Sequence, residues 1–210
     1  MWFSCRPANR GRAAVDRGPN SVRRQVNVRH AQGRDIGRMA AVLTRAFADD
    51  PIYVWSFGER SDTWARRFFK WQLKRLADQD VTWTTRGRDG AAVWALPGQW
   101  RESPAELLRL VMITTPAIHR RLRAVVSGLS MIDERHPQQP HMYLALLGVD
   151  PALQRQGIGS ALITPGLAVC DRERVPAYLE TSKAGNLAFY ARHGFVEKDR
   201  VDIPGGPSVW

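Results

Sequence analysis

Two glycines separated by one residue, Gly157 and Gly159, lie where the apolar run 141–149 gives way to a helical pattern. Glycines where a strand passes into a helix leave the backbone amides uncovered, and the helix dipole adds positive potential at the same place. Such a turn favours a phosphate-bearing ligand. A plain structural turn is an equally good interpretation of so short a pattern.

Three phosphate-binding patterns can be compared with this turn. A dinucleotide fingerprint requires Gly or Ala at a position that Leu162 occupies here. A Walker loop requires Lys followed by Ser or Thr after the last glycine, and no lysine stands nearby. An acyl-CoA loop has Gln or Arg, two residues, Gly, one residue, then Gly or Ala, and Gln154, Gly157 and Gly159 match it. The surrounding elements must decide between this loop and a plain turn.

The elements predicted around the turn alternate between strands and helices. The runs 141–149 and 177–181 are predicted as parallel strands, joined by a helix to about residue 174 that Pro165–Gly166 interrupts. Before these strands, the sequence predicts a strand at 26–30, a helix at 36–47, a helix that Ser61 caps and a hairpin at 81–96. One or two helices then run from the capping box at Ser103 to about residue 134. After the parallel strands, a short helix at 186–195 and strands from Val196 are predicted. The predicted fold class is a mixed α/β sheet.

Composition and charge limit the class of protein. The net charge of +11 is uneven, since residues 1–30 hold seven arginines and one aspartate. We predict a basic, disordered extension at 1–25, with a polyanion-binding tail or a targeting segment as alternatives, and one domain at 26–210. The two cysteines, Cys5 and Cys170, have no metal-like or redox spacing, so no metal site is predicted and a cytoplasmic location fits. No apolar run is long enough to span a bilayer.

Several sequence segments together resemble one enzyme family. "LLGVDP", "QRQGIGSAL", a crossover helix, a strand ending "LETS" and the helix "NLAFYARHGF" resemble the acetyl-CoA core of the GNAT superfamily of N-acetyltransferases. Within that superfamily the likeness is closest to the enzymes that acetylate puromycin, through "AAVW", Pro165–Gly166, "VPAYLETS" and "GPSVW". It spans residues 26–210 and is strongest from Tyr143 onward. It implies the GNAT acyl-CoA N-acyltransferase fold, with a splayed central sheet flanked by helices.

The resemblance also implies where acetyl-CoA, the co-substrate, would bind. Backbone groups near Leu147 and Val149 would pair with its pantetheine arm. Backbone amides of the turn would surround its pyrophosphate, as the glycine pattern already indicates. Asn186 would cap the following helix and contact the cofactor. The cofactor-binding residues expected are Leu147, Val149, Gln154, Gln156, Gly157, Ile158, Gly159, Ser160 and Asn186.

Attack of an amine on a thioester requires a base for the ammonium proton, donors for the oxyanion and an acid for the leaving sulfur. Tyr190 matches the family's tyrosine and is the predicted acid, because a phenol stays protonated at neutral pH. Glu180, at the carboxyl end of a strand, is the predicted base. Asp50 is an alternative base, at a position where the puromycin enzymes carry a tyrosine, and His141 is a weaker one, expected on the surface.

The predicted function is therefore acetyl-CoA-dependent acetylation of a primary amine of a small molecule. An aminonucleoside antibiotic such as puromycin is one candidate acceptor, which would make the protein an antibiotic-resistance enzyme. The alternatives are a protein N-terminal or lysine acetyltransferase, or a non-catalytic acyl-CoA-binding or nucleic-acid-binding protein. A nucleic-acid partner is less favoured than a small amine, and no membrane partner is expected. A homodimer that forms through the strand ending at Trp210 is left open.

Overall fold

The computed structural model describes residues 26–58, 62–76 and 79–210 of the chain. The basic extension predicted at 1–25 and the helix cap predicted at Ser61 lie outside these residues. No helix in the described ranges combines the length and apolar character needed to cross a membrane.

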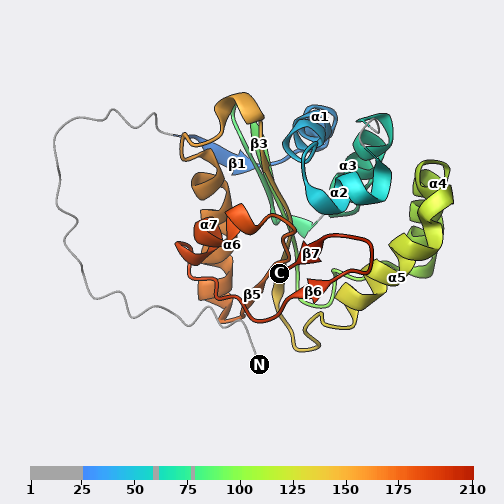
Figure 1. Ribbon diagram of the computed structural model, residues 1–210. Helices are drawn as coiled ribbons and strands as arrows, with labels where there is room; N and C mark the ends of the chain where they lie inside the picture. Colours follow the sequence, from blue (N-terminus) through green and yellow to red (C-terminus); the bar gives the residue numbers. More distant parts are fainter. Residues whose placement is uncertain (1–25, 59–61, 77–78) are drawn as a thin grey trace.

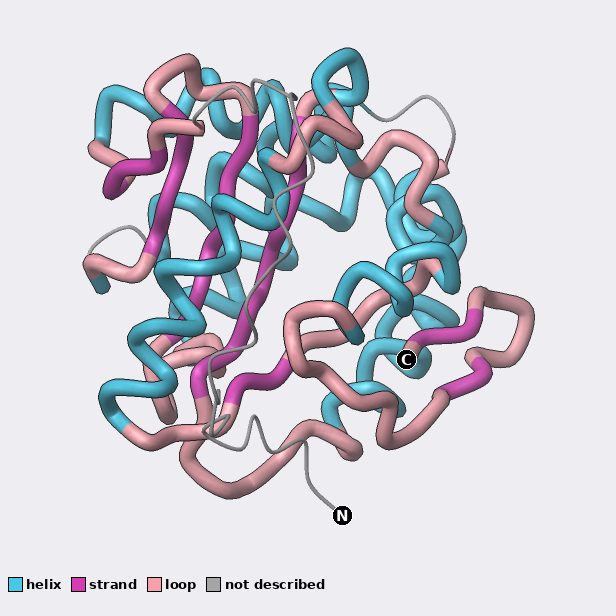
Figure 2. The backbone as a smooth tube through the Cα atoms, turned by 90° about the vertical axis from the view of Figure 1, so that its left-hand side faces the viewer, coloured by secondary structure: helices cyan, strands magenta, loops and turns pink. Residues whose placement is uncertain are grey.

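A five-stranded sheet forms the centre of the molecule, and its strands follow one another in chain order (Figures 1 and 2). The first four strands pair antiparallel, and the last pair is parallel. The hairpin and the parallel pair predicted from the sequence are therefore confirmed. The strands are β1 (Val28–His30), β2 (Thr82–Thr85), β3 (Gly90–Ala95), β4 (Met142–Val149) and β5 (Ala177–Tyr178).

Helices cover both faces of this sheet (Figure 1). On one face, α1 (Ile36–Ala46) and α3 (Asp62–Leu76) pack on Val93 and Leu146. On the other face, α6 (Ile158–Glu173) packs on Trp94 and Leu144. Adjacent residues of β3 thus point to opposite faces, as the pleat of a strand requires. The apolar character of β4 is explained by cover on both sides.

A β-bulge interrupts β4. Trp94 pairs with Leu144 and Val93 with Leu146, so Ala145 is an extra residue on β4. Leu144 and Leu146 would share a face in a regular strand, but they pack in opposite cores because of this insertion. A bulge bends its strand, and this one lies at the start of the stretch of β4, from Leu144 onward, that no longer pairs with β5.

The remaining helices border the sheet. The capping box predicted at Ser103 is confirmed. The backbone N–H of Ser103 donates to Glu106 Oε2 (2.8 Å), and the backbone N–H of Glu106 donates to Ser103 Oγ (3.3 Å). It starts α4 (Pro104–Ile118), and α5 (Leu122–Asp133) completes the predicted helical region. The other elements are α2 (Pro51–Phe57), α7 (Leu187–Ala191), and the 3-10 turns η1 (Gly33–Asp35), η3 (His119–Arg121), η4 (Pro151–Leu153) and η5 (Ala184–Asn186).

Some predicted boundaries were wrong. β5 ends at Tyr178 instead of residue 181, because the chain turns away from β4 there. No strand starts at Val196; β6 (Val201–Asp202) and β7 (Ser208–Val209) form a separate small sheet (Figure 2). The backbone N–H of Trp210 donates to the carbonyl of Thr181, and the reverse bond is also made, both at 2.9 Å. The final residue is therefore paired within the chain.

Helix α6 runs across Pro165–Gly166 without a break, so the helix does not end at this pair. The glycine has a packing role instead. A β-carbon at Gly166 would lie 2.3 Å from the Trp94 ring and would clash with it. Glycine has no β-carbon, so it is the residue that permits this close approach. Gly166 thus lets the crossover helix approach the sheet closely.

Candidate active site

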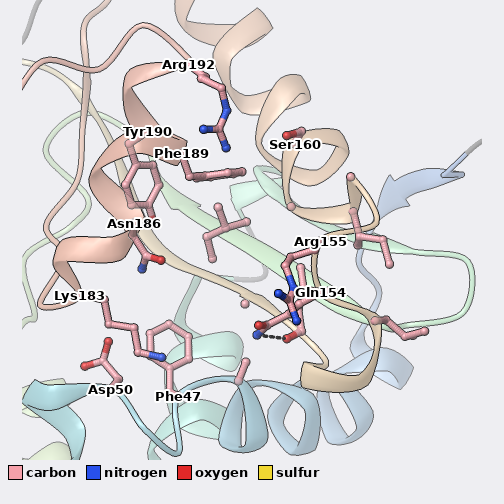
Figure 3. Close-up of a pocket in the computed structure, with 18 residues that line it drawn as sticks. Phe47, Asp50, Gln154, Arg155, Ser160, Lys183, Asn186, Phe189, Tyr190 and Arg192 are labelled. Carbon is pink, nitrogen blue, oxygen red and sulfur yellow. Dashed lines mark hydrogen bonds between the residues drawn. The ribbon is translucent and has the colours of Figure 1, made fainter. Parts of the chain in front are cut away.

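A cavity of about 560 Å³ lies between the end of β4, the start of α6 and α7 (Figure 3). β4 pairs with β5 only at Met142 and Tyr143, so the two strands are separate from Leu144 onward. The cavity is bordered by Leu147, Gly148 and Val149 on one side of this gap and by Asn186 and Tyr190 on the other. The splayed sheet predicted from the sequence is therefore present and opens into a cavity.

The glycine turn forms one wall of this cavity. Gly157 caps α6 in a left-handed conformation, with φ of 81°. A β-carbon there would meet no atom within 4 Å, so the backbone conformation is what requires glycine. At Gly159 a β-carbon would lie 3.5 Å from the Phe189 ring, an ordinary contact. Of the two glycines, Gly157 is thus the one that the turn itself depends on.

Most of the predicted cofactor-binding residues are brought together here. Gln154 Nε2 donates to the carbonyl oxygen of Val149 (3.2 Å), which ties the turn to β4 (Figure 3). Gln156 is exposed in the same turn and is not among the lining residues. The predicted residues that do line the cavity are Leu147, Val149, Gln154, Gly157, Ile158, Gly159, Ser160 and Asn186.

Three basic side chains that sequence reasoning did not select also line the cavity. They are Arg155, Lys183 and Arg192, and they lie around its rim in Figure 3. Lys183 Nζ also bonds to Asp49 Oδ1. Arg155 lies inside the acyl-CoA pattern, between Gln154 and Gly157, and this position could have identified it from the sequence. Positive side chains beside a helix N-terminus suit a ligand with several phosphates.

A second cavity of about 310 Å³ adjoins the first. Side chains from α2, α3, β4, α5 and β7 form its walls. It shares five lining residues with the first cavity, so the two cavities meet at these side chains: Phe47, Asp50, Leu147, Asn186 and Tyr190. Two ligands could therefore be held with their ends in contact.

Asp50 lies at this junction and is only 6% exposed. Its Oδ1 accepts from the Ile52 N–H (3.1 Å), which caps α2, and from the Ser182 hydroxyl (2.6 Å). Burial raises the pKa of this carboxyl above its ordinary value. The Asp50–Pro51 pair is a recognised helix start, a signal for α2 that the sequence prediction missed.

Tyr190 lies at the same junction, on α7. Its ring packs edge-to-face against Phe189 and Phe195, with centroids 5.2 and 5.9 Å away. Burial, and next the charge of Asp50, raise the pKa of the hydroxyl, so it is protonated at neutral pH. The side chain of Asn186 does not cap α7 as predicted; it donates to Thr181 Oγ1 (3.3 Å).

Glu180 lines the second cavity as part of a buried polar cluster. Its Oε1 lies 3.2 Å from His136 Nδ1, and its Oε2 accepts from the Tyr143 hydroxyl (2.9 Å). His136 Nε2 lies 2.9 Å from His141 Nε2, and its ring stacks on Trp100 with centroids 3.5 Å apart. The sequence prediction missed His136, for which the only signal was its position five residues before His141.

His141 does not lie on the surface as predicted. It is 3% exposed, and burial lowers the pKa of its ring. Its ring contacts His136, which in turn contacts Glu180. Among the described residues, no group of three or more histidine, cysteine, aspartate or glutamate side chains could hold a metal ion.

The splayed sheet, the glycine turn and the two joined cavities form a site with room for two ligands that meet end to end. Residues 97–195, just under half the chain, match the model of the acetyltransferase (GNAT) family. Over these residues the chain is similar to the GNAT acetyltransferases, and it is an acetyl-CoA-dependent N-acetyltransferase. The predicted fold class is confirmed.

Individual relatives agree with this family. An uncharacterised N-acetyltransferase of Schizosaccharomyces pombe is 22% identical over 193 residues, which is 82% of this chain and 75% of the relative. A Corynebacterium glutamicum structure described as histone acetyltransferase HPA2 and related acetyltransferase has a TM-score of 0.64 and 24% identity, over 88% of this chain and 93% of that one. The PaiA N-acetyltransferase of Thermoplasma acidophilum, solved with coenzyme A, has a TM-score of 0.51 and 10% identity, over 88% and 96%.

These likenesses support the family without indicating an individual substrate. They give no evidence for puromycin acetylation or antibiotic resistance in particular. The first cavity fits acetyl-CoA on its own features, because it combines a left-handed glycine, a helix N-terminus and three basic side chains beside an unpaired stretch of β4.

Proposed function

We propose that the protein acetylates a primary amine of a small molecule, and that residues 26–210 form a single acetyltransferase domain. The observation that carries this proposal is the second cavity, which meets the first at Asp50 and Tyr190. Its volume of about 310 Å³ is at the lower end of the range for small-ligand pockets. Side chains from several separate elements line it, and its small volume suits a small acceptor better than a folded protein surface.

The lining of this acceptor cavity suits a positively charged amine. Tyr53, Trp100 and Tyr143 provide aromatic rings that attract cations through their π faces. Four carboxylates line the cavity: Asp50, Glu102, Asp133 and Glu180. Arg75, which is paired with Glu102 at 3.6 Å, is the one arginine or lysine of the described lining. An ammonium ion is thus favoured over an anionic acceptor.

The cofactor cavity would be the site of acetyl-CoA, which supplies the acetyl group and a thiolate leaving group when bound. Leu147 and Val149 offer the backbone groups of a strand edge, and Gly157, Ile158 and Gly159 offer the amides at the helix start. Tyr190 holds a proton on its hydroxyl at the junction and would donate a hydrogen bond there. Its raised pKa favours such a bond over full release of the proton.

The proton balance of the reaction requires a carboxylate at the junction. The amine arrives as an ammonium ion, since the reference pKa of an alkyl ammonium such as lysine is about 10.4. In the overall transfer an N–C bond replaces a C–S bond, and the nitrogen gives up two protons. One ends on the departing sulfur, and a protein carboxylate takes the other and passes it to solvent. Asp50 and Glu180 are the two candidates that the sequence and the cavity provide.

Release of the CoA thiol across a panel of amines tests this proposal. The full chain is incubated with acetyl-CoA and small alkylamines, arylalkylamines, diamines or puromycin, and with peptides that carry a free N-terminus or a lysine. We expect thiol release with small amines at a kcat/KM at least tenfold above that of any peptide. Preference for peptides would instead support the protein acetyltransferase alternative. Acetyl-CoA binding with no thiol release from any amine would support the non-catalytic one.

A further inference from the structure

The hydrogen bonds around Glu180 fix where its protons lie. His141 Nδ1 is 2.7 Å from the carbonyl oxygen of Gln139, which can only accept, so Nδ1 donates. The contacts between His136 Nε2 and His141 Nε2, and between His136 Nδ1 and Glu180 Oε1, each need one proton as well. Two neutral rings supply two of these three protons. The third is held within the cluster of His141, His136 and Glu180.

This third proton makes Glu180 a poor base. If His136 donates from both ring nitrogens, it is an imidazolium ion beside the Glu180 carboxylate. His136 is 5% exposed, and a further proton on Glu180 would leave this buried cation beside a neutral acid, which is costly. If the shared proton sits on Glu180 instead, that carboxyl is already protonated. Neither arrangement leaves Glu180 ready to accept the proton of the amine.

Glu180 is nevertheless well placed to bind a cation. Its carboxylate interacts with three side chains, His136, Tyr143 and Tyr178, and a carboxylate offers about four acceptor positions in all. The side chain is 18% exposed and lines the acceptor cavity. About one acceptor position therefore remains for a donor in that cavity.

Asp50 differs from Glu180 in position and in surroundings. It lines both cavities, whereas Glu180 lines the acceptor cavity and is absent from the cofactor cavity. The donors to its side chain, the Ser182 hydroxyl and the backbone N–H groups of Ile52 and Tyr53, are neutral, and the nearby Lys183 is paired with Asp49, so protonation of Asp50 leaves no buried cation unpaired. Burial raises its pKa, which increases its affinity for a proton near neutral pH.

We propose that the two carboxylates divide the work: Asp50 takes the proton of the amine at the junction, and Glu180, held as an anion by His136, binds the ammonium form in the acceptor cavity. This division rests on the proposed function. Asp50 is then the catalytic base in place of Glu180, which the sequence favoured, and His136 is a positioning residue. In the step itself an N–H bond of the ammonium ion breaks, its electron pair stays on nitrogen, and the proton forms an O–H bond on Asp50.

The titratable groups near both carboxylates bear on the pH dependence. Those that face His136 and Glu180 are His141, Tyr143 and Tyr178. Those that interact with Asp50 are Lys183, Tyr53 and Tyr190. Raised pKa values keep these four tyrosines protonated at neutral pH, so Asp50 itself is expected to set the acid limb of the rate profile.

Paired amide variants separate the two roles in steady-state kinetics. In Asp50→Asn we expect kcat to fall at least a hundredfold with the KM for the amine changed less than threefold, since Asn still caps α2. The wild-type kcat should rise with pH as Asp50 loses its proton, and this rise should be absent from the variant. In Glu180→Gln we expect the KM for the amine to rise at least tenfold with kcat within threefold. The opposite pattern, with kcat and the acid limb lost only in Glu180→Gln, would overturn the proposal.

If the wild-type chain acetylates no amine, the proposed function is refuted. Two measurements that need no turnover still test the roles of the two carboxylates in that case. Nitrogen NMR of the imidazoles at pH 7.5 should show His136 protonated on both nitrogens in the wild type and on one in Glu180→Gln. Calorimetric titration with a small alkylamine should show at least tenfold weaker binding in Glu180→Gln and less than threefold weaker binding in Asp50→Asn. A neutral His136 in the wild type, or equal affinities in the two variants, would contradict the assigned roles.

Discussion

Replacing Tyr190 with phenylalanine should lower kcat about a thousandfold and leave the Kd for acetyl-CoA within twofold. The change removes one hydroxyl at the junction of the two cavities and keeps the ring that packs against Phe189 and Phe195. A donor that acts on the departing group affects the transition state more than the bound ground state, so the loss should fall on kcat. Stopped-flow thiol release and equilibrium acetyl-CoA titration measure the two quantities separately.

The Tyr190→Phe result is informative only if the variant remains folded. Near-ultraviolet circular dichroism and an unchanged acetyl-CoA Kd would establish this. A kcat within threefold of the wild type would show that the hydroxyl has no part in the reaction. A rise in the acetyl-CoA Kd that matches the whole loss of kcat/KM would show instead that Tyr190 binds the cofactor.

Replacing Gly157 with valine should weaken acetyl-CoA binding at least a hundredfold. The φ of 81° at this position is unfavourable for a β-branched residue, so the turn must shift or bear strain of about 1–3 kcal/mol. The new side chain would also stand in the wall of the cofactor cavity, where the amides at the start of α6 are exposed. A hundredfold loss corresponds to about 2.8 kcal/mol. Isothermal titration with acetyl-CoA measures the effect directly.

Gly98→Val provides a matched control for this variant. Gly98 also has a left-handed φ, 76°, and a β-carbon there would also meet no atom within 4 Å. It lines neither the cofactor cavity nor the acceptor cavity. Valine at Gly98 should therefore lower the melting temperature about as much as valine at Gly157 and leave the acetyl-CoA Kd within threefold. Equal losses of affinity in both variants, or normal binding by Gly157→Val, would mean that Gly157 only makes a turn.

The part of the fold that carries the cofactor cavity could be predicted because its signals are local. The apolar run of β4, the glycines at the start of α6 and the capping box at Ser103 each fall within a few neighbouring residues. The parallel pairing of β4 and β5 followed from the helix between them. The residues predicted to bind the cofactor come mostly from this same continuous stretch, and eight of the nine line the cavity.

The acceptor cavity could not be predicted in the same way. Its key contacts join residues far apart in the chain, such as Ser182 with Asp50, separated by 132 positions, and Glu180 with His136, separated by 44. These contacts arise because β5 turns away from β4 after Tyr178 and carries the following segment toward α2 and α5. No sequence period indicates where two splayed strands separate. His141 was misplaced for the same reason, since its burial depends on His136 and the surrounding rings.

The central claim is that the two cavities hold acetyl-CoA and a small amine in line, meeting beside Asp50 and Tyr190. It is tested most directly by the affinity of a conjugate in which the CoA sulfur is joined through a –CH2–CO– linker to a small alkylamine. We predict a Kd at least a hundredfold below those of CoA and of the free amine, because one molecule would fill both cavities at the entropy cost of one binding event. A Kd equal to that of CoA alone would contradict the account.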